Sequence, residues 1–269
     1  MSALVEIDAL RVATDGGTEL VHGVTVTVPR GGSVGIVGES GSGKTLTCRA
    51  LLGILDRGLH VTEGSIRFDG VELAHATDKE RRALWGQRIG AVFQDPASYL
   101  NPSIRVGTQL EESLRVVGGL SRSAAKRRTI ELFAAVGLRE PERVARQYVF
   151  ELSGGMLQRV LIAIAVSNNP ELLIADEATT ALDVVVQADV LDLLSRLRAE
   201  LGLTLVVVSH DLAVIAQMCD YIYVFKDGVI VEEGVTADVL AHQQHEYTSS
   251  LVDSHLTYGL NRLGAGAVA

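Results

Sequence analysis

Cysteine is scarce in this sequence. Its 269 residues include only 2 cysteines, Cys48 and Cys219. So few cysteines cannot build the disulfide framework of a small secreted protein or a cysteine-rich metal site. We therefore expect two reduced, buried thiols, of the kind that proteins in a reducing compartment carry.

Long apolar runs and an excess of positive charge are also missing. No stretch reaches the roughly 18–20 apolar residues of a membrane-spanning helix, and the first eight residues are acidic and alternating, unlike a secretory signal. Lys and Arg total 24 against 33 Asp and Glu, a formal net charge of −9. Binding to nucleic acid needs a basic face that releases counterions. We expect no nucleic-acid partner, and any membrane association through another chain.

What the sequence does contain is enough apolar material for a globular core. Hydrophobic residues make up 47% and charged residues 21% of the chain, which suits one large or two small domains. Residues 4–12 and 20–28 alternate apolar and polar, a pattern typical of half-buried antiparallel strands. We also expect strands near residues 33–37, 64–70 and 89–94.

From about residue 96 to 152 the spacing is helical, with helices expected over residues 106–117 and 121–136. The basic run Lys126-Arg127-Arg128 lies here, and either a solvated face or a surface for an anionic partner accounts for it. A helix is then expected over residues 153–166. Beyond it, strands at 172–175, 203–208 and 221–225 alternate with helices at 184–201 and 212–218. This order predicts a mainly parallel sheet, with ligands at the carboxyl ends of its strands.

The strongest single motif is a phosphate-binding loop at residues 38–45, which reads Gly38-Glu39-Ser40-Gly41-Ser42-Gly43-Lys44-Thr45. Glycines let backbone N–H groups curl around phosphate oxygens, while Lys44 brings a positive charge to the β- and γ-phosphates and Thr45 can ligate Mg²⁺. An apolar strand precedes the loop and a helix follows it, so the helix dipole favours anions there. A glycine-rich structural turn is the alternative.

Two adjacent carboxylates, Asp176 and Glu177, end the apolar segment 172–175. Successive side chains of a strand point opposite ways, so we expect different tasks for them. Asp176 is suited to hold Mg²⁺, and Glu177 to orient and polarise an attacking water. A solvated acidic strand end is the alternative, and the phosphate-binding loop argues against it.

Two further side chains follow strands at the same expected sheet edge. His210 comes after strand 203–208, within reach of a γ-phosphate, although a lone histidine at a strand end is usually an ordinary polar group. Gln94 ends the strand before Asp95-Pro96. Its amide can contact Mg²⁺ or the attacking water and report the nucleotide state to the helical segment.

Ser153, Gly154 and Gly155 open the helix at 153–166. A serine cap and two glycines make a second anion site at a helix N-terminus, though an ordinary N-cap explains them as well. The chain would then contain two phosphate-binding elements but only one phosphate-binding loop. We therefore expect a dimer in which the loop of each subunit faces the Ser-Gly-Gly segment of its partner.

Over about residues 4–255 these motifs, in this order, resemble the ATP-binding subunit of ABC transporters. Gly38–Thr45 resembles Walker A, residues 152–158 the family signature, residues 172–177 Walker B and Ala181-Leu182-Asp183 the D-loop. The resemblance implies an α/β fold with a RecA-like P-loop NTPase core and an antiparallel β subdomain (1–95 and 161–235). It also implies an inserted helical signature subdomain (96–160) and a C-terminal extension (236–269).

The same resemblance implies the site residues of an ATPase. The catalytic residues would be Glu177, His210 and Gln94, and Mg²⁺ would be held by Thr45, Gln94 and Asp176. The nucleotide contacts would be Gly38, Glu39, Ser40, Gly41, Ser42, Gly43, Lys44, Thr45, Thr47, Ser153, Gly154, Gly155 and Asp183.

Within the family, Phe93-Gln94-Asp95-Pro96, Met156 and His245-Glu246-Tyr247-Thr248 are similar to the peptide and nickel importers. The last match also argues against a metal site at His242 and His245. Peptide-importer ATPases often carry a C-terminal cysteine cluster for an iron–sulfur centre, and this chain has no cysteine beyond Cys219. Segments 20–24, 45–48 and 254–259 resemble the nickel importer D-type ATPase, so nickel is preferred over peptide.

Three departures from the family pattern stand out. Ala178 and Val149 replace prolines, which loosens a loop without abolishing catalysis. No aromatic residue precedes Phe68, whereas the family usually stacks adenine on one in its N-terminal strands. An aliphatic residue such as Val12 would then take that place.

The function that the resemblance implies is an ATP-hydrolysing motor of an ABC importer, energising uptake of nickel or a chelated metal across the cytoplasmic membrane. Two alternatives are a di- or oligopeptide importer ATPase and a weakly hydrolysing regulatory nucleotide-binding subunit. The implied partners are a second, non-identical ABC ATPase subunit, two transmembrane permease subunits and an extracytoplasmic substrate-binding protein. The chain would then lie at the cytoplasmic face of the membrane, held there by the permease.

Overall fold

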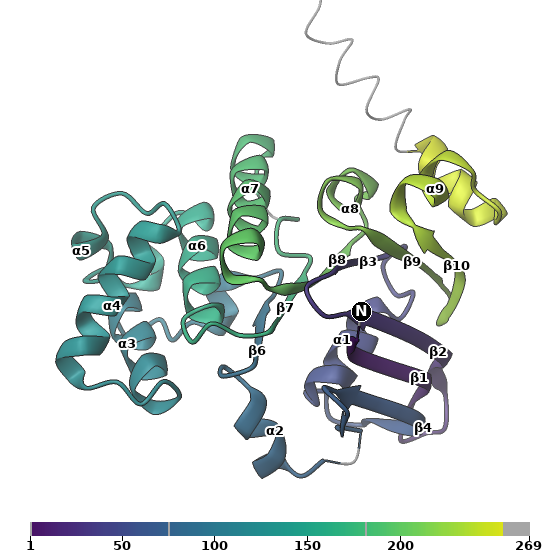
Figure 1. Ribbon diagram of the computed structural model, residues 1–269, viewed down its shortest axis with the longest axis horizontal. Coiled ribbons are helices and arrows are strands. Elements are labelled where there is room, and N and C mark those ends of the chain that lie inside the picture. Colours follow the sequence, from purple (N-terminus) through teal and green to yellow (C-terminus); the bar gives the residue numbers. More distant parts are fainter. Residues whose placement is uncertain (1, 75, 181, 255–269) are drawn as a thin grey trace, which may run out of the picture. The chain divides into compact units, whose positions relative to one another are not determined.

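The computed structural model describes residues 2–74, 76–180 and 182–254. The chain divides into two compact units, one made of Met1–Thr77 and Val206–Ala269 and the other of Asp78–Leu205. Each is described by itself, with the elements labelled as in Figure 1. The α/β class expected from the sequence is confirmed, because each unit contains both strands and helices.

An antiparallel sheet forms the N-terminal part of unit 1. Its strands, β1 (Ala3–Thr14), β2 (Glu19–Pro29), β4 (Leu59–Phe68) and β5 (Val71–Glu72), are arranged in the order β2-β1-β4-β5. In Figure 1, β1, β2 and β4 lie side by side. The alternation in β1 and β2 predicted this pairing, which is confirmed.

Strand β4 begins earlier than the sequence predicts, at Leu59 and not at Gly64. Gly64 marks a bulge inside the strand, opposite Ala9 of β1, whose φ is 47°. A Cβ on Gly64 would lie 2.6 Å from the carbonyl oxygens of Asp8 and Ala9. A glycine is needed here because the backbones of β4 and β1 approach closely. From the sequence alone, such a glycine inside a strand is easily taken for the end of the strand.

The second sheet of unit 1 has strand order β10-β9-β3-β8. Strand β3 (Ser33–Val37) pairs parallel with β9 (Tyr221–Lys226), and β9 pairs antiparallel with β10 (Val229–Val235). Strand β8 (Thr204–Ser209) enters this unit from the other. Helices α1 (Lys44–Leu52) and α8 (Leu212–Met218) belong to the same unit.

Unit 2 combines a parallel pair of strands, β6 (Ile89–Val92) and β7 (Leu172–Asp176), with a set of helices. Its helical elements are α2 (Asp78–Leu84), η1 (Pro96–Tyr99), α3 (Val106–Val116), α4 (Arg122–Ala135), α5 (Pro141–Val144), η2 (Val149–Glu151), α6 (Gly154–Ala165) and α7 (Val184–Leu201). Helices α3 to α6 gather in one cluster in Figure 1, with Leu110, Leu114, Phe133 and Ile162 fully buried.

The C-terminal part of unit 1 is more regular than the sequence predicts. Helix α9 spans Thr236–Ala241, and residues 246–254 are helical as well. The nickel-like segment 254–259 lies almost entirely outside the described residues. Among the described residues, no helix is both long and apolar enough to cross a membrane.

Candidate functional site

The phosphate-binding loop of unit 1 connects the carboxyl end of β3 to the start of α1, as predicted. Three of its glycines have left-handed backbones, with φ of 153° at Gly38, 85° at Gly41 and 99° at Gly43. A Cβ on Gly38 would lie 2.1 Å from the carbonyl oxygen of Phe225, whereas a Cβ on Gly41 would meet nothing within 4 Å. The loop is therefore packed tightly on strand β9 at Gly38 and open at Gly41.

Lys44 is buried at the centre of this loop, with 4% of its surface exposed. Its Nζ donates hydrogen bonds to the carbonyl oxygens of Gly38 (2.8 Å) and Glu39 (2.6 Å) and to the Ser42 hydroxyl (3.4 Å). A buried ammonium must be satisfied in this way. The loop thus keeps a positive charge at the helix N-terminus, where it attracts an anion.

Thr47 supports the loop from beneath. It is fully buried, and its hydroxyl donates to the Gly43 carbonyl oxygen at 3.0 Å. This bond joins the first turn of α1 to the last glycine of the loop. The predicted contact of Thr47 with nucleotide stays a prediction, as do the nucleotide contacts of Ser40 and Thr45.

Two residues far along the chain also hold the loop, and neither contact was predicted from the sequence. The N–H of Gly228, in the turn between β9 and β10, donates to the Ser42 carbonyl oxygen at 3.1 Å. The N–H of Glu39 donates to the phenol oxygen of Tyr247 at 2.9 Å. The only signal for Tyr247 in the sequence was the segment 245–248, which pointed to a subfamily and not to a contact.

His210 follows β8 in unit 1 and is exposed. The turn around it is fixed by its neighbours: the Asp211 N–H donates to the Ser209 hydroxyl at 2.9 Å, and the Asp211 carboxylate caps α8 through the Ala213 N–H at 2.8 Å. Because these bonds hold the backbone, the imidazole is presented at a fixed place after the strand.

In unit 2, Asp176 and Glu177 lie in different environments, while the different tasks expected of them stay a prediction. Strand β7 ends at Asp176, which is 5% exposed. Glu177 has already left the strand, with a left-handed φ of 49° and a half-buried side chain that accepts a hydrogen bond from the Thr180 hydroxyl at 3.5 Å. The alternation of strand side chains therefore does not extend to Glu177. A left-handed glutamate is costly, and such residues gather at functional sites.

Gln94 lies just beyond β6 and is exposed. The segment after it is held locally, since the Asp95 carboxylate accepts the Ala97 N–H at 3.2 Å and the rings of Phe93 and Tyr99 stack with centroids 4.6 Å apart. The amide of Gln94 is thus available for contact with another group.

The predicted N-cap of α6 is confirmed, because the Ser153 hydroxyl accepts the Met156 N–H at 3.4 Å. A Cβ on Gly155 would lie 2.6 Å from Val186 of helix α7, while one on Gly154 would meet only Leu182, at 3.7 Å. Asp183 caps α7 by accepting the N–H groups of Val185 (3.2 Å) and Val186 (3.0 Å). Capping alone accounts for the place of Asp183, and its predicted nucleotide contact stays a prediction. Ala181 lies outside the described residues.

Val12 cannot stack on an adenine ring, because it is fully buried in the core of unit 1. This corrects the expectation that Val12 replaces the missing aromatic residue. An alternating strand has one face toward the core, and Val12 lies on that face.

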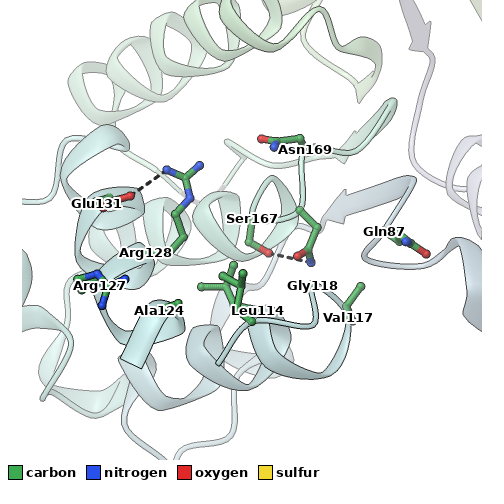
Figure 2. Close-up of a pocket in the computed structure, with 12 residues that line it drawn as sticks. Gln87, Leu114, Val117, Gly118, Ala124, Arg127, Arg128, Glu131, Ser167 and Asn169 are labelled. Carbon is green, nitrogen blue, oxygen red and sulfur yellow. Dashed lines mark hydrogen bonds and ion pairs between the residues drawn. The ribbon is translucent and has the colours of Figure 1, made fainter. Parts of the chain in front are cut away.

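Unit 2 also contains a pocket of about 620 Å³, built between the ends of α3 and α6 and the start of α4. Figure 2 shows Arg127, Arg128 and Glu131 on one of its walls. The Asn168 amide, which also lines the pocket, donates to the Ser167 hydroxyl at 3.3 Å. The amide of Asn168 is fixed by the Gly86 carbonyl oxygen at 2.9 Å. The basic run of the sequence therefore contributes two of its residues to a hollow, next to the exposed Leu120.

Unit 1 thus holds the phosphate-binding loop and His210, and unit 2 holds Gln94, Asp176, Glu177, Ser153, Gly154, Gly155 and Asp183. The first set can bind a phosphate chain. The second contains two adjacent carboxylates, Asp176 and Glu177, and a capped helix N-terminus.

Comparison with known proteins shows the family to which the chain belongs. The family model described as "ABC transporter" matches residues 21–180. The probable D,D-dipeptide transport ATP-binding protein DdpD of Escherichia coli is 41% identical over 249 residues, which cover 92% of this chain and 76% of that protein. The oligopeptide transport ATP-binding protein OppD of Bacillus subtilis is 39% identical over 258 residues, covering 94% of this chain and 72% of that protein.

Solved structures match the fold. The dimeric, post-hydrolysis structure of the ATP-binding cassette MJ0796, bound to ADP and Pi, has a TM-score of 0.76 at 30% identity and covers 86% of this chain and 98% of that one. Subunit cbiO1 of Clostridium perfringens, part of the transporter complex cbiONQ, has a TM-score of 0.78 at 25% identity and covers 98% of each chain. This chain belongs to the ABC transporter family: it has the ABC ATPase fold and is the ATP-binding, ATP-hydrolysing subunit of such a transporter.

Proposed function

We propose that this chain is the ATPase motor of an importer that takes up small peptides. The observation that carries this proposal is the set of relatives named for dipeptide or oligopeptide transport, at 38–42% identity over most of this chain. The sequence favoured nickel on three short segments, and one of these, 254–259, lies almost entirely outside the described residues. The relatives carry no nickel name, so they support the peptide alternative over nickel.

The residues of unit 1 would bind the nucleotide. Backbone N–H groups of the loop and the ammonium of Lys44 would hold the β- and γ-phosphates, with Gly38, Glu39, Ser40, Gly41, Ser42 and Gly43 shaping the loop. Lys44 now donates to loop carbonyls, and it would exchange part of these bonds for phosphate oxygens. His210 would contact the γ-phosphate from its fixed turn.

The residues of unit 2 would perform hydrolysis. Glu177 would orient and polarise the attacking water, while Gln94 would contact it and report the nucleotide state to the helices that follow. Thr45, Gln94 and Asp176 would hold Mg²⁺, since hydroxyl, amide and carboxylate oxygens are the donors that this hard cation prefers. When bound, Mg²⁺ neutralises the charge that develops on the phosphate oxygens.

Two such subunits would sandwich ATP, each covering the partner's phosphate-binding loop with the N-terminus of α6. The support is the exposed, capped turn at Ser153 and Gly154, and the dimeric state of the similar cassette MJ0796. The partner would be a related, non-identical ATPase subunit. The whole complex would include two permease subunits and an extracytoplasmic substrate-binding protein.

A permease segment would dock on the helical unit, beside residues 94–101 and in the pocket that Figure 2 shows. The pocket is large enough for several side chains, and Val116, 77% exposed, and Tyr99, 48% exposed, are large hydrophobic side chains on the surface of the same unit. This contact would hold the chain at the cytoplasmic face of the membrane. Ala124 lines the pocket, so Ala124→Trp should fill it and abolish transport while leaving ATP binding by the isolated subunit intact.

Uptake measurements test the cargo. Cells with the complete transporter should lose uptake of a labelled dipeptide when Glu177 becomes Gln, and uptake of labelled nickel should not change. Loss of nickel uptake alone would return the assignment to the metal importer. If neither changed, the assignment of this motor to either cargo would be wrong.

A further inference from the structure

One peptide unit of the phosphate-binding loop is held at both of its ends. The carbonyl oxygen of Gly38 accepts a hydrogen bond from Lys44 Nζ at 2.8 Å, and the N–H of Glu39 donates to Tyr247 Oη at 2.9 Å. These two groups belong to the same peptide bond, which is planar and rigid. Whatever fixes its N–H therefore also fixes the direction of its carbonyl oxygen.

The direction of this carbonyl matters for Lys44. The ammonium is placed by two consecutive carbonyl oxygens, those of Gly38 and Glu39. The N–H that Tyr247 holds is that of Glu39, so it lies between these two carbonyl groups along the backbone. On its other side, Gly38 leaves no room for a Cβ, which would lie 2.1 Å from the Phe225 carbonyl oxygen, and its φ of 153° is left-handed. Glycine resists rotation poorly, so a hydrogen bond from outside the loop is an effective restraint at this point.

Tyr247 is itself well placed to act as a fixed anchor. Only 8% of its surface is exposed, and the Lys226 ammonium lies 5.0 Å from its ring centroid, a cation–π contact. Its own N–H donates to His245 Nδ1 at 3.1 Å, which fixes the start of the helical segment 246–254. Ring, backbone and hydroxyl are thus each restrained by a different partner.

The segment that carries Tyr247 is anchored to the sheet by one carboxylate. Glu232 of β10 accepts the N–H groups of Gln244 (2.8 Å) and His245 (3.0 Å) and is 9% exposed. The chain of contacts therefore runs without a gap from β10 through residues 244–247 to the phosphate-binding loop, all within unit 1.

The phenol stays neutral in this setting. Burial raises the pKa of Tyr247, and the carboxylates of Glu39 and Asp227 raise it further, while the hydrogen bond from the Glu39 N–H acts in the opposite direction. A neutral phenol oxygen accepts a hydrogen bond at every pH at which the protein would be assayed.

We propose that Tyr247 is a positioning residue for Lys44: through the Gly38–Glu39 peptide unit it orients the carbonyl oxygen that places the Lys44 ammonium for the phosphates of ATP. The C-terminal segment, far from the loop in sequence, thereby becomes part of the nucleotide site. The proposal goes beyond the family's own ATP site, and it needs only the ATP binding that family membership establishes.

Tyr247→Phe tests it, since only the hydroxyl is lost. Removing one hydrogen bond of this kind should weaken ATP and ADP binding about three- to tenfold, measured by calorimetric titration of the purified full-length chain with Mg²⁺ present. The matched control is Tyr223→Phe. The Tyr223 phenol is also buried and also accepts a backbone N–H, that of Thr27 at 3.0 Å, but it does not touch the loop. This control should lower the thermal midpoint and leave nucleotide affinity unchanged.

A double-mutant cycle separates positioning from general support. If Tyr247 acts through Lys44, then Tyr247→Phe in a Lys44→Ala background should cost little further affinity. An equal loss in both backgrounds would overturn the proposal, and so would a Tyr247→Phe variant that melts earlier but binds ATP as the wild type does. A wild-type chain that failed to bind ATP in the same titration would overturn the nucleotide site itself, and with it the positioning role of Tyr247.

Discussion

The phosphate-binding loop and the capped turn at Ser153 are built in opposite ways. The loop at residues 38–45 in unit 1 is held by groups far away in sequence, among them the Gly228 N–H and the Tyr247 phenol. The turn at Ser153 in unit 2 is held by its own helix, through hydrogen bonds from the Met156 N–H to the Ser153 hydroxyl and from the Leu157 N–H to the Ser153 carbonyl oxygen. A loop that must keep a buried lysine in place needs bracing from several sides, whereas a helix N-terminus supplies its N–H groups without help.

The same contrast extends to the chemistry. Unit 1 holds Lys44, the cation that we propose binds phosphate, and unit 2 holds Glu177, half-buried and with a left-handed backbone. If nucleotide binding and hydrolysis are separate tasks of the two units, their variants should differ. Substitutions in the loop should weaken nucleotide binding, and substitutions of Glu177 should reduce turnover.

The largest effect is expected for Glu177→Gln. The amide keeps the shape of the side chain but cannot accept a proton, so ATP turnover by the assembled transporter should fall about 100-fold or more, with ATP affinity retained. Phosphate release and nucleotide titration measure the two quantities. Glu200→Gln is the control, because Glu200 lies at the end of α7 in a surface ion pair with Arg196. Equal turnover in both variants would remove Glu177 from the mechanism.

Gly38→Ala should give the next largest effect, on stability as well as binding. The added Cβ would meet the Phe225 carbonyl oxygen at 2.1 Å, so the backbone must move, at a cost of about 3 kcal/mol in the free energy of unfolding.

Gly41→Ala is the matched variant for this test. Its φ of 85° is also left-handed, but its Cβ would meet nothing within 4 Å, so only the conformational cost of about 1 kcal/mol remains. Urea denaturation compares the two. If both lost the same stability, the close packing of the loop on β9 would not be what holds it.

The contrast between the two turns also explains which features could be predicted from sequence. The loop at 38–45, the cap at Ser153 and the alternating strands are local patterns, and the structure confirms them. Strand β10 was missed because the adjacent Glu232 and Glu233 hide its alternation, and α2 because Asp78–Leu84 is mostly charged. The Tyr247 contact joins residues 208 positions apart, a pairing that a local pattern does not contain.

Ser153→Ala should have a smaller effect on stability, and it sharpens the comparison of the two turns. Loss of an N-cap destabilises a helix by about 1 kcal/mol. Ser121 caps α4 in the same way, through the Ala124 N–H at 3.3 Å, so Ser121→Ala should cost a similar amount. Only Ser153→Ala should also reduce ATP turnover of the assembled transporter. If turnover were the same in both variants, Ser153 would be a cap and nothing more.

The smallest effect concerns Glu232, the carboxylate that anchors the segment carrying Tyr247. Burial by itself raises the pKa of Glu232, but the neighbouring Thr248 side chain and the hydrogen bonds from the Gln244 and His245 N–H groups outweigh it, and the net pKa is lowered. A carboxyl whose pKa is lower in the folded state stabilises that state above its unfolded pKa, and the contribution disappears as the pH falls through the folded pKa. Glu232→Gln should therefore lower the free energy of unfolding by less than about 1 kcal/mol near neutral pH. Below about pH 4, denaturation curves of variant and wild type should converge. A difference that persisted at low pH would mean that the charge of Glu232 is not what holds the segment.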